Sequence, residues 1–355
     1  MGPLTIPSRS ASLLHTAAQV GVGNDAASTL AAALTWMLRD GAGMVGRIVF
    51  AWAKASSLDR DARFWRLVAD VLNDAALMLD ILSPAFPRAF LALVCVSSVL
   101  KAVVGVAGGA TRMALTQHQA RQFNHADVAA KDGSQETAVN LAALLAGLAL
   151  LPAVHGQPGW VWAVFVAATL AHIYANYRAV KAVVMESFDE QRLRLLAAVL
   201  DERGGAASPA DIDPPAIARR ERLWFASRPA HVGCRIAAVA AEAAAWAALR
   251  RAAGDRPYVV GRLTAAPGAG ARRGALTGAV LRADAPATAV VEACVAAHLL
   301  ERRIAGQPAA DVSDAAADVA RVLGPPGALA GKLEAAGWRF EPLAYPIDAW
   351  RAEWN

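Results

Sequence analysis

Two long apolar segments joined by a tight turn most constrain the fold of this chain. Residues 138–154 are mostly apolar, HGQPG follows, and WVWAVFVAATLAHIYANY then returns over 160–177. A helix that spans a bilayer needs about 17–25 apolar residues, so each arm reaches the lower limit. Amphipathic aromatic side chains stand at both ends of the returning arm, as they do at the two bilayer interfaces: Trp160, Trp162, Tyr174 and Tyr177. The pattern favours a membrane-embedded hairpin, and a hairpin buried in a large soluble helical core is the alternative.

The composition also favours a membrane protein. Of the 355 residues, 56% are hydrophobic and only 18% are charged, below the roughly 25% usual for soluble domains. The net charge of +5 is spread along the chain without a dense basic block, which argues against nucleic-acid binding.

Two glycine patterns near the N-terminus resemble dinucleotide-binding motifs. These are GVGNDA (21–26) and GAGMVG (41–46). The motif requires a strand before its first glycine, whereas helical sequence precedes both, so a helix break or close helix packing is the favoured explanation. We expect ASTLAAALTWMLRD to form a helix that stops at GAG (41–43), with a second helix through 46–53. In the apolar run at 89–110, Gly105 and Gly109 have the small-residue spacing that lets helices approach closely.

The segment 59–82 has apolar residues at helical spacing and a cluster of charges. The helix predicted here carries Asp70 and Asp74 on one face. Arginines alternate with the carboxylates, so surface ion pairs explain the cluster more simply than acid–base catalysis. His155 and His172, which flank the hairpin, are expected to be structural.

The pattern changes beyond Gly254. RPYVVGRL (256–263) and ALTGAVLRAD (275–284) predict strands, and ATAVVEACVAAHLLERRI (287–304) predicts a helix. Two further helices over 314–324 and 327–337 and a last strand over 338–345 complete a small α+β unit.

The fold class predicted is therefore mainly α, with a helical membrane-associated N-terminal domain and a small α+β C-terminal domain. The expected parts are, in order, an atypical N-terminal segment (1–19), a helical domain (20–201), a linker rich in Gly, Pro and Asp (202–215), connecting helices (216–253) and the C-terminal domain (254–355).

A long polar run, TQHQARQFNHADVAAKDGSQET (116–137), separates two apolar segments. Asp132 or Ser134 would make a good N-cap for a helix that begins near Thr137. Capping does not explain why so many charged and amide side chains gather here, since polar groups next to lipid are costly unless they face water, partners or a ligand. We therefore predict a binding surface, in which cations hold an anionic ligand and the amides and carboxylates orient it: Arg112, His118, Arg121, Asn124, Asp127, Lys131, Asp132, Gln135 and Glu136.

Other chemistry is weakly supported. His118 and His125 share a helical face and could bind a metal with Asp127, but Arg121 lies on that face and no third ligand has a diagnostic spacing. Lys131 could form a Schiff base with an aldehyde cofactor only in a suitable environment. The three cysteines, Cys95, Cys234 and Cys294, are expected to be buried free thiols. With no catalytic motif in the sequence, we expect no enzyme activity, no cofactor and no metal.

Several blocks of this sequence closely resemble the root UV-B sensitive (RUS) family, which is built on a domain of unknown function. They occur in order within residues 20–185: GVGNDAASTLAAALTWMLRDGAGMVGRIVFAW, FWRLVADVLND, KAVVGVAGGATRMALTQHQARQFNHADVAAKDGSQETAVNL and HIYANYRAV. GWRFEPL near the end is similar to the family's C-terminal domain. The sequence departs from the family at MGPLTIPSRSASLLHTAAQ, which stands where members carry Gly-Tyr-Pro and Asp-Tyr segments.

The resemblance implies an integral or tightly associated membrane protein without assigned enzymatic activity. Plant members are linked to UV-B responses in roots, vitamin B6 homeostasis and auxin transport, and are often plastid-associated. The resemblance implies no catalytic residues in this chain. Membrane lipid and another family member, as a homo- or hetero-oligomer, are the expected partners, and a plastid is the expected organelle if the source is a plant or an alga.

We expect a non-enzymatic membrane protein with a regulatory or homeostatic role, which binds a small molecule or a partner protein through the polar run. One alternative is a transporter of a vitamer-like small molecule. Its support is the glycine-interrupted segments GAGMVG and GVAGGAT and the lysine Lys101 inside an apolar run. A pyridoxal-phosphate-binding protein that uses Lys131 is the least supported alternative.

Overall fold

The computed structural model describes residues 29–58, 61–122, 124–223, 230–263, 277–305, 311–345 and 347–354. The sequence expectations for residues 1–19 and for GVGNDA lie outside these ranges. The described chain is mostly helical with a few short strands, which confirms the mainly α prediction. Its contacts divide into two compact units, Met1–Val183 and Val184–Asn355.

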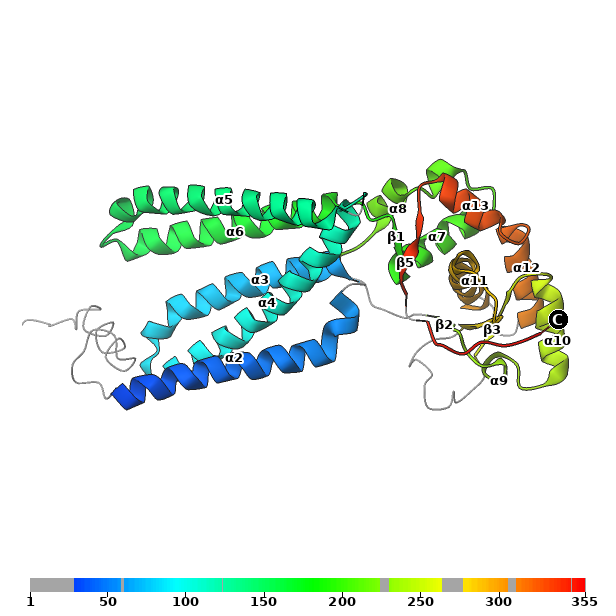
Figure 1. The fold of residues 1–355 in the computed structure, drawn as a ribbon, viewed down its shortest axis with the longest axis horizontal. Coiled ribbons are helices and arrows are strands. Elements are labelled where there is room, and N and C mark those ends of the chain that lie inside the picture. Colours follow the sequence, from blue (N-terminus) through cyan, green and yellow to red (C-terminus); the bar gives the residue numbers. More distant parts are fainter. Residues whose placement is uncertain are drawn as a thin grey trace, which may run out of the picture. The chain divides into compact units, whose positions relative to one another are not determined.

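Three long helices form one part of the first unit (Figure 1). They are α2 (Thr29–Leu58), α3 (Ala62–Leu82) and α4 (Phe90–Gln119). The short 3₁₀ turns η1 (Ser83–Ala85) and η2 (Pro87–Ala89) separate α3 from α4, and each has a proline in its first two positions, a residue that interrupts an α-helix. Helix α4 packs against both α2 and α3.

Helix α2 corrects one sequence prediction, because it continues through GAGMVG without a break. The glycines serve close packing instead. A Cβ built on Gly46 would lie 2.9 Å from Val99 Cγ1, and one on Gly43 would lie 2.6 Å from Ser98 Oγ, both on α4. Absent side chains at these two positions therefore let α2 approach α4, in the manner of small-residue helix interfaces. The predicted pair of Gly105 and Gly109 on α4 differs, since a Cβ on Gly109 would meet nothing within 4 Å.

The predicted hairpin is present as α5 (His125–Val154) and α6 (Pro158–Ala182). The turn falls at the predicted HGQPG segment, where Gly156 has a φ of +73°, a conformation that glycine adopts without steric cost. Large apolar side chains are exposed along both helices, among them Val139, Leu144, Leu151, Trp160 and Leu170.

Three of the described helices are long and apolar enough to cross a membrane: Pro87–Gln119, His125–Ala153 and Gly159–Ala182. None of the most apolar stretch of the second or the third is buried within the protein. A water-soluble monomer would bury such surfaces, since soluble monomers rarely expose large contiguous apolar patches.

In the described part of the second unit, the buried helix α11 (Ala287–Ala305) lies among six helices and two small sheets (Figure 1). Every residue of α11 from Ala289 to Leu300 is buried, as expected for a helix whose residues are predominantly apolar all round. The surrounding helices are α7 (Glu190–Glu202), α8 (Pro214–Arg220), α9 (Ile236–Val239), α10 (Ala243–Ala253), α12 (Val312–Leu323) and α13 (Ala328–Ala335).

The strands of the second unit pair in two sheets. In one, β1 (Ser187–Asp189) runs parallel to β5 (Arg339–Ala344). The other has the order β2-β4-β3 and consists of β2 (His231–Val232), β3 (Tyr258–Arg262) and β4 (Thr277–Leu281). The β3–β4 pair is antiparallel and β2–β4 is parallel. The strands β3, β4 and β5 were predicted from their sequence, whereas β1 and β2 were not.

The contacts place the division of the chain earlier than the predicted linker at 202–215. That segment contains the turn η3 (Pro209–Asp211), and Ile212 within it is fully buried in the core of the second unit. Helix α7, assigned from the sequence to the N-terminal domain, packs on α11. A division of contacts does not test independent folding, so the predicted domain limits stay a prediction.

We expect Gly46→Ala to destabilise the helical unit relative to Gly41→Ala. Both changes add one methyl group to α2, and both raise its helix propensity by up to about 1 kcal/mol. A Cβ at position 41 meets nothing within 4 Å, whereas at position 46 it meets the stiff side chain of Val99. Overpacking costs about 1–3 kcal/mol, so the melting temperature in detergent should fall for Gly46→Ala only. Equal melting temperatures for the two variants would contradict close packing at Gly46.

Candidate functional site

The polar run lies where α4 ends and α5 begins, and Arg112 connects the two helices. Its Nε and Nη2 atoms both lie 2.7 Å from Asp132 Oδ2, and Nη1 lies 2.6 Å from Glu136 Oε2. Asp132 and Glu136 are one helical turn apart on α5, so one guanidinium reaches both carboxylates. The three side chains are 40%, 50% and 56% exposed. The cluster therefore lies at the surface, where water screens its charges.

A second ion pair lies within α5, on a different face of the helix from Asp132 and Glu136. Lys131 Nζ lies 2.8 Å from Asp127 Oδ2, four residues earlier in the helix. Both side chains are more than half exposed. The two cations Arg112 and Lys131 are thus paired with carboxylates of the same polar run.

The other predicted site residues lie around the connection between the helices. His118 is half-buried near the end of α4, while Arg121, Asn124 and Gln135 are exposed. Asn124 Oδ1 accepts a hydrogen bond of 3.4 Å from the backbone N–H of Gln122. The predicted residues are therefore neighbours along the α4–α5 connection, and whether they bind a ligand stays a prediction.

The start of α5 corrects the predicted helix N-cap. The helix begins at His125 after Asn124, not near Thr137, so Asp132 and Ser134 lie inside it. Ser134 Oγ donates instead to the carbonyl of Ala130 at 2.8 Å, and Asp132 is held by Arg112. Helix-forming residues such as Ala129, Ala130 and Lys131 extend the helix toward its N-terminus.

Helices α3 and α6 share two polar contacts that the sequence did not reveal. His172 Nδ1 lies 2.9 Å from Asp74 Oδ2, and Arg63 Nη1 donates to the Val183 carbonyl at 2.9 Å. The contacts are equally spaced along the two segments, from 63 to 74 on α3 and from Val183, the residue that follows α6, back to 172 on α6, so the helices run antiparallel.

These contacts refine the expected surface ion pairs on α3. Asp74 is only 11% exposed and contacts another helix. Arg66 and Asp70, by contrast, pair within α3, where Arg66 Nε lies 3.9 Å from Asp70 Oδ2. The expectation that His172 is structural agrees with its contact with Asp74.

An ion pair also joins α3 to the apolar helix α4, because Lys101 Nζ contacts Asp80 Oδ2. Lys101 lies within the candidate span Pro87–Gln119. A charged residue inside such a segment normally pairs with an opposite charge, as it does here.

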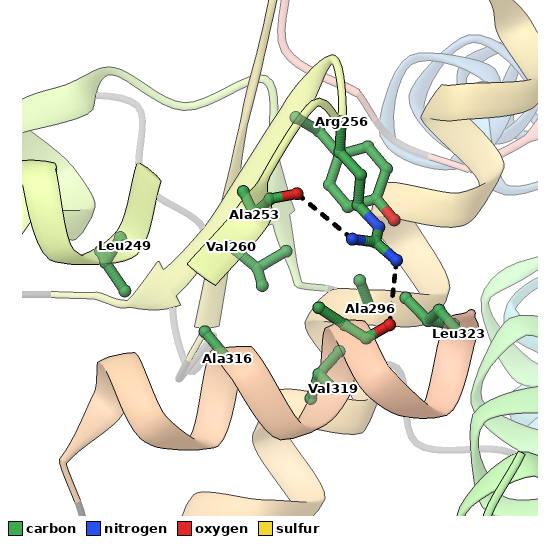
Figure 2. A pocket seen from close by; sticks show the side chains of 10 residues that line it. Leu249, Ala253, Arg256, Val260, Ala296, Ala316, Val319 and Leu323 are labelled. Atoms are coloured by element: carbon green, nitrogen blue, oxygen red, sulfur yellow. Dashed lines mark hydrogen bonds between the residues drawn. The ribbon is translucent and has the colours of Figure 1, made fainter. Parts of the chain in front are cut away.

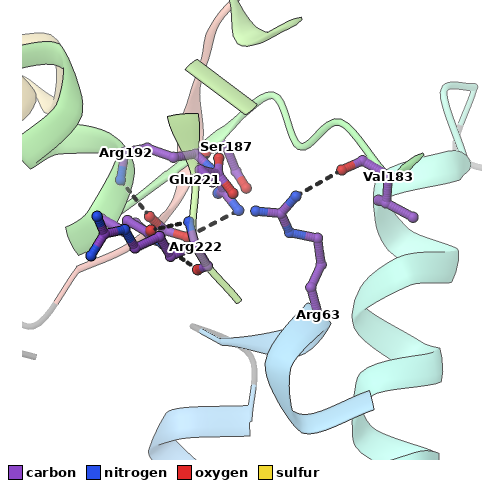
Figure 3. Close-up of polar contacts among 8 residues, drawn as sticks. Arg63, Val183, Ser187, Arg192, Glu221 and Arg222 are labelled. Atoms are coloured by element: carbon purple, nitrogen blue, oxygen red, sulfur yellow. Dashed lines mark hydrogen bonds and ion pairs between the residues drawn. The ribbon is translucent and has the colours of Figure 1, made fainter. Parts of the chain in front are cut away.

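The second unit contains a buried ion-pair cluster (Figure 3). Arg192 Nε donates to Glu221 Oε1 at 2.8 Å, Nη2 lies 2.9 Å from Asp189 Oδ2, and Nη1 donates to the Ser187 carbonyl at 2.6 Å. The three charged side chains are at most 9% exposed. The cluster ties β1 and α7 to the segment after α8, and its burial indicates a structural role.

A cavity in this unit is too small for a ligand (Figure 2). It has a volume of about 10 Å³, room for about one water molecule. Arg256 on its wall donates to the carbonyls of Ala253 at 3.2 Å and Ala320 at 2.9 Å. The arginine thereby fastens the end of α12, which is a structural role.

The thiols and histidines of the described chain offer little chemistry. All three cysteines are free; Cys234 and Cys294 are buried, while Cys95 is half-buried. Burial raises the pKa of Cys234 to about 12 and also raises the pKa of Cys294, so neither forms a reactive thiolate at neutral pH. Burial lowers the pKa of His298. Among the residues that the structure describes, no three His, Cys, Asp or Glu side chains are placed to hold a metal ion.

Comparison with known proteins defines the class of protein to which this helical unit corresponds. A family model described as the vitamin B6 photo-protection and homoeostasis domain matches residues 7–203. The chain belongs to this family, that of the root UV-B sensitive proteins, which confirms the resemblance found in the sequence.

Curated relatives come from a plant and from a social amoeba. Protein root UVB sensitive 3 of Arabidopsis thaliana is 43% identical over 193 residues, which cover 54% of this chain and 44% of that protein. RUS family member 1 of Dictyostelium discoideum is 42% identical over 196 residues, covering 54% and 37%. Protein root UVB sensitive 2, chloroplastic, of Arabidopsis thaliana is 28% identical over 199 residues, covering 56% and 45%.

This chain therefore matches less than half the length of each of these relatives. No solved structure matches it.

We expect Arg112→Ala and Arg192→Ala to differ strongly in stability, although each removes an arginine paired with two carboxylates. Arg112 is 40% exposed and Arg192 is 5% exposed. Exposed pairs contribute up to about 1 kcal/mol, whereas removing one partner of a buried pair costs about 3–5 kcal/mol. Denaturant unfolding followed by circular dichroism should show a small loss for Arg112→Ala and a large one for Arg192→Ala. A large loss for Arg112→Ala would mean that the polar run is a structural clamp and not an available surface.

Proposed function

We propose that this chain is a non-enzymatic membrane protein with a regulatory role in vitamin B6 homeostasis, which binds a partner protein or a small molecule through residues 112–136. Family membership supports the vitamin B6 association. The three apolar helices support the membrane location.

The observation that carries this proposal is the division of α5 into two chemically different halves. Its first part contains Asp127, Lys131, Asp132 and Glu136, and its second part exposes large apolar side chains such as Leu144 and Leu151. A helix of 30 residues is about 45 Å long at 1.5 Å per residue, longer than the roughly 30 Å hydrocarbon core of a bilayer. The apolar half would lie in lipid, and the polar half would stand in water beyond it.

The ion pairs of the polar half suit exchange with a partner. Arg112 and Lys131 are held by carboxylates in exposed pairs, each of which contributes up to about 1 kcal/mol. An anionic ligand or an acidic segment can therefore replace these carboxylates at low cost, and a second member of the family is one such partner.

Catalysis and a bound cofactor are not part of the proposal. The pyridoxal-phosphate alternative requires the free amine of Lys131. Lys131 is 72% exposed and paired with Asp127, and not enclosed in an apolar pocket as Schiff-base lysines are, so this alternative has the least support.

The proposed location is a membrane, and a plastid membrane if the source is a plant or an alga. One relative carries the word chloroplastic in its name, and this supports the organelle only by analogy.

We expect the full chain to stay in the membrane pellet after alkaline carbonate extraction and to enter the detergent phase on phase separation. The exposed apolar surface of α5 and α6 gives the reason, because it is stable in lipid and not in water. Release of the chain into the carbonate supernatant would overturn the membrane part of the proposal.

Site-directed labelling in the same membranes supplies a matched control. In a background in which Cys95, Cys234 and Cys294 are all changed to serine, Gln135→Cys should react with a water-soluble maleimide, while Leu145→Cys on the same helix should react only after the membranes are dissolved in SDS. Equal labelling of both positions in intact membranes would show that the two halves of α5 share one environment.

A transporter is the second candidate, favoured by the ion pair of Lys101 with Asp80 inside a candidate span. The glycine segments GAGMVG and GVAGGAT no longer support a transporter, because α2 and α4 continue through them and are not interrupted helices. We expect proteoliposomes that contain the chain to take up no labelled pyridoxine beyond empty liposomes. Uptake that Lys101→Ala abolishes would favour the transporter instead.

A further inference from the structure

A pocket lies in the helical unit, away from the polar run. It has a volume of about 250 Å³ and is bounded by α2, α4 and the junction of α3 with η1. Its lining includes Trp36, Arg39, Asp80, Ser83, Phe90 and Val94. Val94 precedes Arg112 by 18 residues on α4, a distance of about 27 Å at 1.5 Å per residue, so this pocket is distinct from the polar run.

The charges of the pocket favour an anion. Asp80 is already paired with Lys101, so its negative charge is compensated from within the protein. Arg39 adds a further positive charge and lies near enough to act on the Asp80 carboxylate. With Lys101 counted, the three side chains carry a net charge of about +1 at neutral pH.

The walls of the pocket favour a flat aromatic ring. The Arg39 guanidinium lies 4.7 Å from the centroid of the Trp36 ring, in a cation–π contact. This contact holds the planar guanidinium beside an indole face, and Phe90 supplies a second aromatic side chain. Ser83 also lines the pocket. Its hydroxyl donates to the Asp80 carbonyl at 3.0 Å and keeps its oxygen lone pairs as acceptors.

We propose that this pocket binds a small planar aromatic molecule that carries one anionic group. Arg39 pairs with the anion, and Trp36 and Phe90 contact the ring. The volume sets the size, because pockets for drug-sized ligands begin near 300 Å³. The pocket therefore fits a single ring with a short anionic substituent. This inference does not depend on ligand binding by the polar run.

Equilibrium dialysis of the full chain in detergent micelles tests the proposal, with pyridoxine 5′-phosphate as the probe. This compound is a single aromatic ring with one phosphate, and it has no aldehyde that could react with lysines. We expect it to bind at least tenfold more tightly than pyridoxine, which lacks the phosphate, and than inorganic phosphate, which lacks the ring. Equal binding of inorganic phosphate and pyridoxine 5′-phosphate would overturn the aromatic part of the proposal.

Charge variants on one helix locate the site. Arg39→Gln should weaken binding of pyridoxine 5′-phosphate by about tenfold or more, since hydrogen bonds to charged groups are the strong ones. Lys54→Gln removes the same charge from an exposed position of α2 and should leave the affinity unchanged. An equal loss in both variants would overturn the proposal, because it would reflect net charge alone.

A second variant keeps the test independent of any effect of Arg39 on folding. Val94→Phe preserves every charge and fills the pocket from α4, so it should also abolish binding while circular dichroism stays unchanged. Unaltered binding by this folded variant would overturn the proposal.

Arg112→Gln separates this inference from the proposed function. If it leaves the affinity unchanged while Arg39→Gln lowers it, the probe occupies the pocket. If only Arg112→Gln lowers the affinity, the probe binds the polar run, which supports the proposed function and overturns the inference.

Discussion

The arrangement of the helical unit depends on how α6 is attached to α3. Helices α5 and α6 expose apolar side chains along their lengths, so the hydrophobic effect in water does not hold them against the other helices. Two polar contacts do so instead: His172 with Asp74, and Arg63 with the carbonyl that ends α6. Where the surroundings are apolar, a hydrogen bond or ion pair between helices has little water to compete with it. Their matched spacing fixes the direction of α6.

Two further sets of ion pairs in this unit follow the same principle. Lys101 pairs with Asp80 across α3 and α4, and Arg112 pairs with Asp132 and Glu136 across α4 and α5. Each of these contacts links two helices. The second unit uses the opposite strategy, since its buried helix α11 is surrounded by apolar side chains and its buried Arg192 cluster lies near the edge of that core.

The sequence predicted those features whose signals are local. Long apolar runs identified the hairpin of α5 and α6, and the change of pattern beyond Gly254 identified β3, β4 and α11. Features that depend on distant partners were missed. The N-cap assigned to Asp132 looked satisfactory until Arg112, 20 residues earlier, proved to hold that carboxylate. Asp74 and His172 are 98 residues apart, and β1 pairs with a strand near the end of the chain. The glycines of α2 resembled a helix break because their reason, the approach of α4, lies on another element. The pocket at Arg39 was also missed, because its lining residues come from different helices.

Because α5 is a single unbroken helix, its two halves form one rigid lever. An α-helix resists bending over a few turns, so a pull on Asp132 or Glu136 cannot be absorbed locally and must tilt or rotate the apolar half as well. The turn at Gly156 passes that movement to α6, whose far end is fastened to α3. The geometry thus converts an event at the polar end of one helix into a torque on the helix pair behind it.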